Sequence, residues 1–145
     1  PWRNAEKCYE CAQNGYEFTC YVQTRQIREE RTMPFINTRT SAEISKEQEI
    51  LLKEKMGKAI SLIGKSESWL MLNFEDNCRL YFKGDNSKNM AIIEVALFGK
   101  ANNSQYDALT EKLTEEISEV LKIDPSNVYI KYEEVEHWGY NGFNF

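Results

Sequence analysis

The chain has 145 residues, and its size and composition limit what it can be. Hydrophobic residues make up 41% and charged residues 28%, as in a globular protein with a buried core. The net charge is −5, and no basic cluster is present that would neutralise phosphates, so no nucleic-acid partner is expected. No apolar run approaches the ~20 residues that span a bilayer, and the N-terminus lacks the apolar core of a secretory signal. We therefore expect no membrane insertion and a cytoplasmic location, with export by a signal-less route left open.

Residues 1–32 differ in composition from the rest of the chain. Three of the four cysteines, Cys8, Cys11 and Cys20, lie there. Residues 1–33 carry five Lys/Arg and five Asp/Glu, so the whole net charge of −5 belongs to residues 34–145. These differences predict two parts, an N-terminal extension over residues 1–32 and a folded domain over residues 33–145.

The extension is predicted to form a cysteine-containing β-hairpin. Asn14-Gly15 is a strong two-residue turn signal, and alternating apolar residues follow it. Cys8 and Cys11 have the spacing of zinc ligands or of a redox dithiol, and Cys20 could add a third zinc ligand. A regular strand would place Cys8 and Cys11 on opposite faces, which favours buried or incidental thiols over both. We therefore expect no metal and no cofactor.

From residue 34 the sequence repeats itself with a constant offset of 59 residues. Three pairs of segments correspond: predicted strands 34–38 and 93–97, helices that start at Ser45 and Ser104, and strands 69–75 and 128–134. Ser45 with Gln48, and more loosely Ser104 with Asp107, are capping-box signatures. The first helix is predicted to run to about Ile63 and to end at Gly64. Two such βαβ repeats predict an α+β fold, with a four-stranded mixed sheet and two helices on one face.

The second face of the predicted sheet also carries apolar residues. Two sets are possible on the second strand, Leu70 and Leu72 or Met71 and Phe74, and the third strand adds Ile92, Val95 and Phe98. Two helices cannot cover both faces of one sheet. Because large apolar patches are rarely left exposed, we expect the chain to associate with itself. Between the halves, residues 79–82 and 84–86 are predicted to form a short strand and a turn.

Several short motifs follow one another in order along residues 33–145. They are Met33-Pro34-Phe35, Gly64-Lys65, Phe82-x-Gly84, Phe98-Gly99-Lys100, Ile123-x-Pro125-x-Asn127-Val128-Tyr129-Ile130 and Trp138-Gly139-Tyr140-Asn141-Gly142-x-x-Phe145. Each is weak alone, but the ordered set, with Lys65 31 residues after Pro34, is specific. In these motifs the chain resembles the macrophage migration inhibitory factor family of the tautomerase superfamily.

The resemblance implies a homotrimer with a pocket between subunits, and keto–enol tautomerase activity. Pro34 would be the general base, Lys65 would bind the carboxylate or enolate oxygen of the substrate, and Tyr129 would come from the neighbouring subunit. The matching pocket positions are Trp69, Phe98, Lys131, Trp138 and Tyr140. Without the family, Lys65 is better explained as a solvated lysine at a helix end, and the aromatic residues as ordinary core.

The sequence departs from the family pattern at several positions. Lys131 stands where the best-known members have an asparagine, and Ser66 where a proline is usual. The family's Cys-x-x-Cys motif corresponds to Met90-Ala91-Ile92-Ile93, so its redox activity is not expected here. Pro34 is also internal: its nitrogen is bonded to the carbonyl of Met33, and an amide nitrogen has no basicity near neutral pH.

The internal proline leads to three functional hypotheses. The first is a non-catalytic scaffold or assembly subunit with a retained pocket for a small arylpyruvate-like ligand, acting as a homotrimer or within a larger protein assembly. The second is an active phenylpyruvate or dopachrome tautomerase, which requires a mature chain that begins at Pro34. The third is a cytokine-like binding protein.

Overall fold

The computed structural model describes residues 33–144. The predicted hairpin, with Cys8, Cys11 and Cys20, lies outside the described residues, as does Phe145. The predicted division into an extension over residues 1–32 and a domain over 33–145 therefore stays a prediction.

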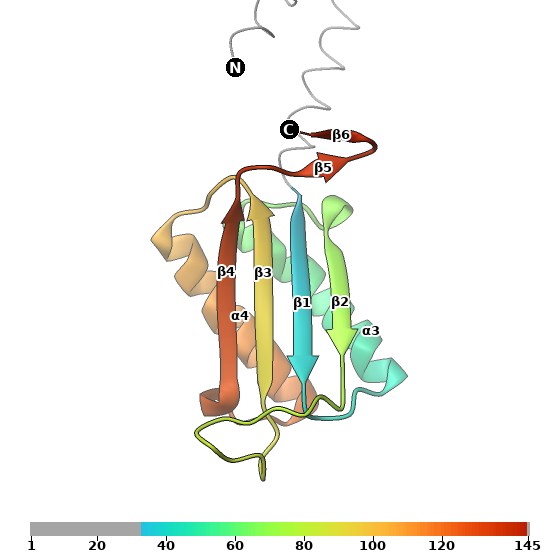
Figure 1. Ribbon diagram of the computed structural model, residues 1–145, viewed down its shortest axis with the longest axis vertical. Helices are drawn as coiled ribbons and strands as arrows, with labels where there is room; N and C mark the ends of the chain where they lie inside the picture. Colours follow the sequence, from blue (N-terminus) through green and yellow to red (C-terminus); the bar gives the residue numbers. More distant parts are fainter. Residues whose placement is uncertain (1–32, 145) are drawn as a thin grey trace, which may run out of the picture. The chain divides into compact units, whose positions relative to one another are not determined.

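The domain is a four-stranded mixed sheet with two long helices on one of its faces (Figure 1). Its main elements are β1 (Pro34–Thr40), α3 (Lys46–Ala59), β2 (Met71–Glu75), β3 (Ala91–Phe98), α4 (Asn103–Leu121) and β4 (Val128–Val135). The strand order is β2-β1-β3-β4; β1 is parallel to β2, β3 is parallel to β4, and β1 and β3 are antiparallel. This arrangement confirms the predicted α+β fold of two βαβ repeats.

The hydrophobic core lies between the sheet and the two helices. Alternate residues of β1 and β3 face the helices, since successive side chains of a strand point to opposite faces. Helix α4 contributes residues at spacings of three and four, which form one stripe on the helix. The fully buried large apolar residues are Ile36, Leu52, Met56, Ile60, Ile93, Val95, Leu97, Leu109, Leu113 and Ile117.

The first helix begins and ends as the sequence predicts. The Ser45 hydroxyl accepts a hydrogen bond from the Gln48 backbone N–H, and the Gln48 side chain accepts one from the Ser45 N–H, which completes the capping box. After Ala59 the chain continues as a 3₁₀ helix, η1 (Ile60–Ile63). Gly64 then ends it with a φ of +71°, a conformation that glycine adopts without steric cost.

The second helix begins two residues earlier than predicted. Its N-cap is Asn102 rather than Ser104: Asn102 Oδ1 accepts from the Gln105 N–H at 2.9 Å, and Gln105 Oε1 accepts from the Asn102 N–H at 2.9 Å. Ser104 lies inside the helix, and its hydroxyl donates to the same Asn102 oxygen. Asn102 and Gln105 provide both halves of a capping box, whereas Ser104 and Asp107 do not.

One predicted strand begins two residues later than expected, and another predicted strand does not form. Residues Glu67–Trp69 form a 3₁₀ helix, η2, and the strand begins only at Met71. Residues 79–82 form no strand; a single antiparallel bridge joins Phe82 to Asp85 around the turn. In the tail, Asn141 and Gly142 form a turn, with φ of +50° and +82°, between β5 (Gly139–Tyr140) and β6 (Phe143–Asn144).

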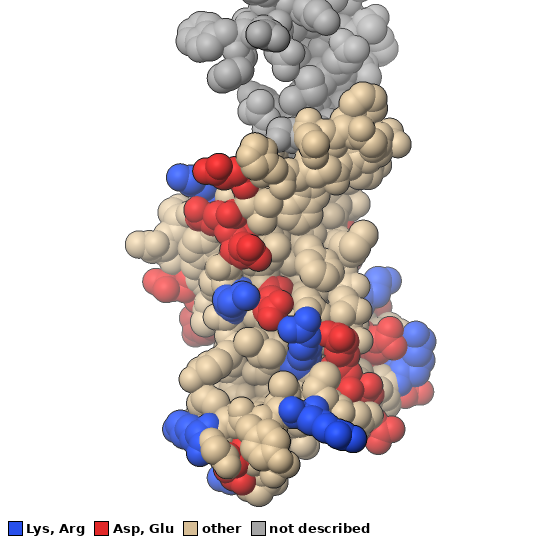
Figure 2. Space-filling view, in the orientation of Figure 1, with Lys and Arg blue, Asp and Glu red and all other residues tan. Residues whose placement is uncertain are grey.

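The second face of the sheet is less apolar than predicted. Leu70, Leu72 and Phe74 pack against the helix-side core, and Val95 is 1% exposed within it. Met71, Ile92 and Phe98 alternate with these residues and occupy the open face. Acidic and basic side chains alternate across the open face (Figure 2). The prediction grouped Met71 with Phe74. It also grouped Ile92 with Val95. The members of each pair are three residues apart, so the period of two places them on opposite faces of the strand.

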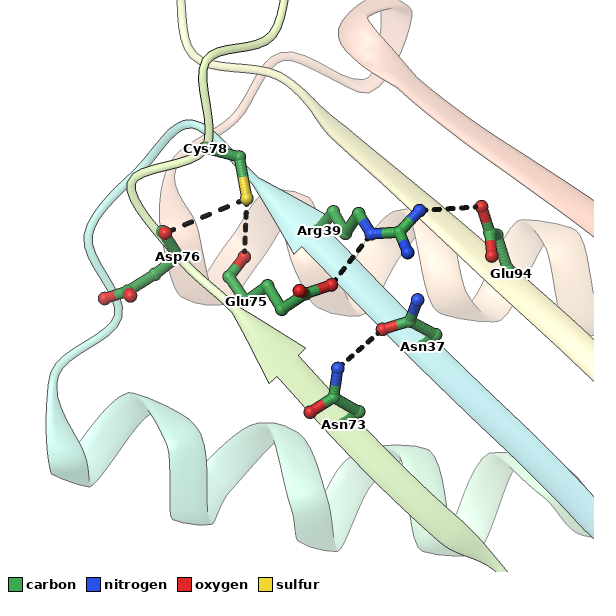
Figure 3. Close-up of polar contacts among 7 residues, drawn as sticks. All are labelled: Asn37, Arg39, Asn73, Glu75, Asp76, Cys78 and Glu94. Carbon is green, nitrogen blue, oxygen red and sulfur yellow. Dashed lines mark hydrogen bonds and ion pairs between the residues drawn. The ribbon is translucent and has the colours of Figure 1, made fainter.

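A polar network crosses the open face (Figure 3). Arg39 on β1 pairs with Glu75 on β2 at 2.7 Å and with Glu94 on β3 at 3.2 Å, and these carboxylates raise the pKa of the guanidinium. The Asn73 side chain donates to Asn37 Oδ1 at 2.8 Å. These contacts link three neighbouring strands by side chains in addition to the backbone ladder.

The corrected helix start can be tested by two alanine substitutions. Asn102→Ala is expected to lower the free energy of unfolding by about 1 kcal/mol, because it removes a cap that satisfies a backbone N–H at the helix start. Ser104→Ala is expected to change it by less than about 0.5 kcal/mol, since alanine is the better residue inside a helix. Urea unfolding of the two variants measures the difference. If Ser104→Ala lowers the free energy of unfolding more than Asn102→Ala does, Ser104 and not Asn102 is the N-cap.

Candidate functional site

One end of the sheet gathers most of the residues that the sequence singles out. Pro34 begins β1 and pairs with Leu97 at the end of β3, because these strands are antiparallel. Phe98 pairs in turn with Val135 at the end of β4. The hairpin of β5 and β6 follows β4 at the same end of the sheet (Figure 1).

The residue that precedes Pro34 is held in the β ladder. Met33 is 3% exposed, and its carbonyl oxygen accepts a hydrogen bond from the Phe98 N–H at 3.1 Å. Pro34 is itself buried. The Pro34 nitrogen is therefore part of a buried peptide group whose carbonyl is hydrogen-bonded. Its lone pair is delocalised into that carbonyl and is not available as a base.

Lys65 reaches the same end of the sheet from the loop after the first helix. Its Nζ donates to the carbonyl oxygen of Phe98 at 2.8 Å. Partial burial of the ammonium lowers the pKa of Lys65 from its usual value of 10.5, because desolvation disfavours the charged form. Gly99 follows at a φ of +88°, and a Cβ at this position would lie 4.0 Å from the Lys65 Nζ. The backbone of Phe98 is thus hydrogen-bonded to both residues: its N–H donates to the Met33 carbonyl, and its carbonyl accepts from the Lys65 ammonium.

The predicted wall residues Trp69 and Tyr140 are in contact with each other. Their ring centroids lie 5.2 Å apart at an angle of 86°, an edge-to-face arrangement that aromatic pairs prefer. This contact connects η2 with the terminal hairpin, so the tail docks through Tyr140. Phe143 at the other side of the hairpin is 71% exposed, and Trp138 is half-buried.

Tyr129 and Lys131 do not join this group within one chain. Tyr129 pairs with Ile92, which pairs with Arg39, so Tyr129 lies five residues along β1 from Pro34, roughly 16 Å at 3.3 Å per residue. Its ring contacts Phe82 edge-on, with the centroids 5.0 Å apart. Lys131 lies opposite Glu94 in the middle of the sheet. The assignment of Tyr129 and Lys131 to the pocket stays a prediction that requires a second subunit.

The role of the Phe98 backbone was missed by sequence reasoning, which assigned Phe98 only an apolar side-chain role. The sequence signal for this role was the glycine that follows Phe98, since Gly99 allows another group to approach the backbone closely at this point.

Within residues 33–144 no group of three His, Cys, Asp or Glu could hold a metal ion. No helix in the same part of the chain is long and apolar enough to cross a membrane.

Comparison with known proteins agrees with this geometry. The family model described as macrophage migration inhibitory factor (MIF) matches residues 33–145. Among solved structures, MIF2 of Leishmania major is 26% identical, with 78% of this chain and 97% of that chain covered and a TM-score of 0.73. A MIF homologue from Prochlorococcus marinus is 28% identical over 77% of this chain and 98% of its own, with a TM-score of 0.70.

A more distant structure, described as a fused 4-OT asymmetric trimer, shares the fold at 14% identity and a TM-score of 0.66, over 75% of this chain and 94% of that one. No curated protein sequence matches the chain. The family match over residues 33–145, the fold, and the convergence of Pro34 and Lys65 at one end of the sheet lead to one conclusion. The chain belongs to the macrophage migration inhibitory factor family.

Proposed function

We propose that this protein is a pseudoenzyme of the MIF family, an assembly subunit that keeps the tautomerase fold and Lys65 but performs no proline-based catalysis. The observation that carries the proposal is the environment of Met33. It is 3% exposed, and its carbonyl is hydrogen-bonded to Phe98 at 3.1 Å, so the peptide group before Pro34 is an integral part of the sheet. Proton transfer between carbon and oxygen needs a basic amine at this position, and an amide cannot provide it.

Loss of the base does not remove the capacity to bind an anion. Lys65 lies beside Phe98 with a partly buried ammonium, and a charge in a partly dry site attracts an anion more strongly than a solvated charge does. The ligand class that fits is a small carboxylate with an aromatic body, bound near Trp69 and Tyr140. This protein would bind such an arylpyruvate-like compound without turnover.

The catalytic part of the proposal is tested by comparing two chain lengths. The 145-residue chain is expected to show no phenylpyruvate tautomerisation above the background of its Pro34→Gly variant. A chain that begins at Pro34 carries a free secondary amine and is expected to be faster by at least about 100-fold, the lower range of general acid–base catalysis. Ketonisation of phenylpyruvate, followed by ultraviolet absorbance, measures both rates.

Three controls make this comparison decisive. Intact-mass measurement verifies each N-terminus, circular dichroism verifies folding, and Pro34→Gly in the shorter chain should abolish its activity. Turnover by the full chain at the rate of the shorter chain would refute the pseudoenzyme. The positions of Lys65 and Phe98 beside Pro34 favour an active tautomerase as the alternative whenever the mature chain begins at Pro34.

Lys65 is expected to contribute most of the affinity of the full chain for a carboxylate ligand. Lys65→Gln should weaken phenylpyruvate binding about tenfold, because a charged hydrogen bond is lost. Lys100→Gln removes the same charge two residues after Phe98 and should leave the affinity within about twofold. Calorimetric titration measures each dissociation constant.

The pH dependence of this binding follows from the lowered pKa of Lys65. The ammonium is charged below its pKa, so anion affinity is present below that pKa and is lost as the pH rises through it. The loss should begin at a lower pH than for a solvated lysine of pKa 10.5, since burial lowers the value. Equal affinity in the wild type and Lys65→Gln would contradict this role.

We further propose that the assembly is a homotrimer. The roughly 16 Å between Tyr129 and the Pro34 end means that only a second copy could bring Tyr129 to Lys65. Tyr129 is 59% exposed on a single chain, and Met71 and Ile92 also lie on the open face of the sheet. A structural relative of the same fold is described as a trimer, which agrees with this arrangement.

Light scattering of the purified chain tests the trimer. The expected mass is three times 17.0 kDa. Tyr129→Asp should shift the protein toward the single-chain mass, because it places a charge in the subunit contact. Ile50→Asp, on the outer surface of α3, replaces a residue of similar exposure, 47%, and should leave the trimer intact. A wild-type mass of one chain would rule out the assembly.

A further inference from the structure

An apolar hollow lies at the end of the sheet where β3 and β4 begin. Its volume is about 150 Å³, and the loop between β2 and β3 forms one side of it. Tyr81 and Tyr129 line the hollow and are 69% and 59% exposed, and Leu80, Phe82 and Ile92 line it as well. The edge-to-face contact between Phe82 and Tyr129 ties the loop to β4. A surface with several exposed apolar side chains in one place is typical of a contact site.

The terminal hairpin of β5 and β6 lies at the opposite end of the same sheet (Figure 1). Phe143 pairs with Tyr140 across this hairpin and is 71% exposed, whereas Tyr140 contacts Trp69. Strand β3 runs from Ala91 at the hollow to Phe98 at the hairpin end, a distance of roughly 23 Å at 3.3 Å per residue. The hairpin of one chain therefore cannot cover the hollow of the same chain.

The two ends of the sheet also carry opposite charges. Residues 78–90 include three basic residues and one acidic residue, whereas residues 133–136 include three acidic residues, which Lys100 in the adjoining loop offsets by one. Figure 2 shows mostly basic side chains around the lower end and mostly acidic ones over the upper part of β4. The residues are Arg79, Lys83, Lys88 and Asp85 at the first end, and Glu133, Glu134 and Glu136 at the second.

These charged side chains are available to a partner. All seven are exposed, and no ion pair among the described residues involves any of them. Opposite charges on two surfaces steer those surfaces toward each other and suppress wrong pairings. The basic end of one chain is therefore complementary to the acidic end of a second copy.

The hollow has the size of one aromatic ring. A protein cavity of about 150 Å³ holds one benzene molecule. Phe143 offers a phenyl ring of that size, and its high exposure means that burial in the hollow would remove most of its apolar surface from water. Size, apolar character and charge thus all match between the hairpin end and the hollow end.

We propose that the terminal hairpin of a second copy docks at the hollow, with Phe143 of that copy between Tyr81 and Tyr129. The acidic segment that precedes the hairpin then lies against the basic loop. Each chain has one hollow and one hairpin, so the contact repeats from head to tail and closes into a ring. This inference rests on the proposed homotrimer and names the two surfaces that form it.

The contact also brings a new residue to the anion site of the second copy. Tyr140 of the hairpin contacts Trp69, which lies four residues after Lys65. A chain that receives this hairpin in its hollow therefore presents Tyr81 to the same region. Tyr81 becomes part of the wall of the neighbouring anion site, a position that the family resemblance does not assign to it.

Photo-crosslinking of the full chain tests the contact directly. With p-benzoylphenylalanine in place of Phe143, irradiation is expected to give a product of twice the chain mass, in which position 143 is joined to residues 80–92 or 127–129. The same probe in place of Tyr81 is expected to join residues 65–69 or 138–144 of another copy. Mass spectrometry identifies the joined peptides. In the control, the probe replaces Ile50, which is 47% exposed on α3, and is expected to reach neither group.

Charge reversal tests the complementarity. Lys83→Glu combined with Lys88→Glu should raise the dissociation constant of the assembly at least about tenfold, because like charges then face each other. Glu133→Lys combined with Glu136→Lys should have the same effect. All four substitutions together should return the constant to within about threefold of the wild type. Analytical ultracentrifugation measures each constant, and circular dichroism verifies folding.

A matched pair on the helical layer serves as the control for charge reversal. Lys53→Glu with Lys58→Glu changes the net charge by the same amount on α3 and should leave the constant within about threefold of the wild type. Equal weakening by this pair would show a general charge effect and would overturn the assigned complementarity.

Three further results would overturn the proposal: a trimer in which position 143 joins no residue of the hollow, crosslinks from position 143 to residues 1–32, or no recovery in the variant with four substitutions. The first of these would leave the homotrimer standing. A wild-type mass of one chain would overturn both the homotrimer and this contact. Failure of phenylpyruvate to bind would refute the proposed anion site and leave the crosslinks unchanged.

Discussion

The antiparallel pairing of β1 with β3 is the interaction on which the rest of this structure depends. Each βαβ repeat contributes one inner and one outer strand, and only the β1–β3 ladder joins the two repeats into one sheet. Its register places Pro34 opposite Leu97. The same register brings the first residue of β1 to the end of β3, where the carbonyl of Phe98 accepts a hydrogen bond from Lys65.

The protein environment can change the basicity of the Lys65 side-chain nitrogen but not that of the Pro34 nitrogen. The ammonium of Lys65 is ionisable, and burial lowers its pKa. The nitrogen of Pro34 is an amide when Met33 is attached, so no arrangement of charge or burial can make it a base. The Met33 carbonyl then serves the sheet as a hydrogen-bond acceptor. The covalent state of this one bond therefore decides whether the Pro34 nitrogen can act as a base.

Much of the fold could be predicted because local signals and the repeat agreed. The capping box of Ser45 and Gln48 and the glycine stop at Gly64 are local, and both were confirmed. The second cap was predicted wrongly although Asn102 and Gln105 carried a better signal, because the repeat offset of 59 residues points to Ser104, whereas Ser45 and Asn102 are 57 residues apart. The open face was predicted wrongly because Met71 was grouped with Phe74 and Ile92 with Val95, although residues three apart on a strand lie on opposite faces.

The contacts at the sites were harder to predict from the sequence than the fold, because they involve individual atoms that the hydrophobic pattern does not specify. The Lys65–Phe98 contact uses a backbone carbonyl, which every residue has. Glu116 carried a signal of a different kind: it lies three residues after Leu113 and four before Val120, inside the apolar stripe of α4. A carboxyl group in such a stripe must be neutralised, paired or bound to a ligand when the helix packs. Because Lys112 reaches only Oε1, at 3.9 Å, and Oε2 has no hydrogen-bond partner among the described residues, burial outweighs the nearby ammonium groups and raises the pKa of the Glu116 carboxyl, which favours its neutral form.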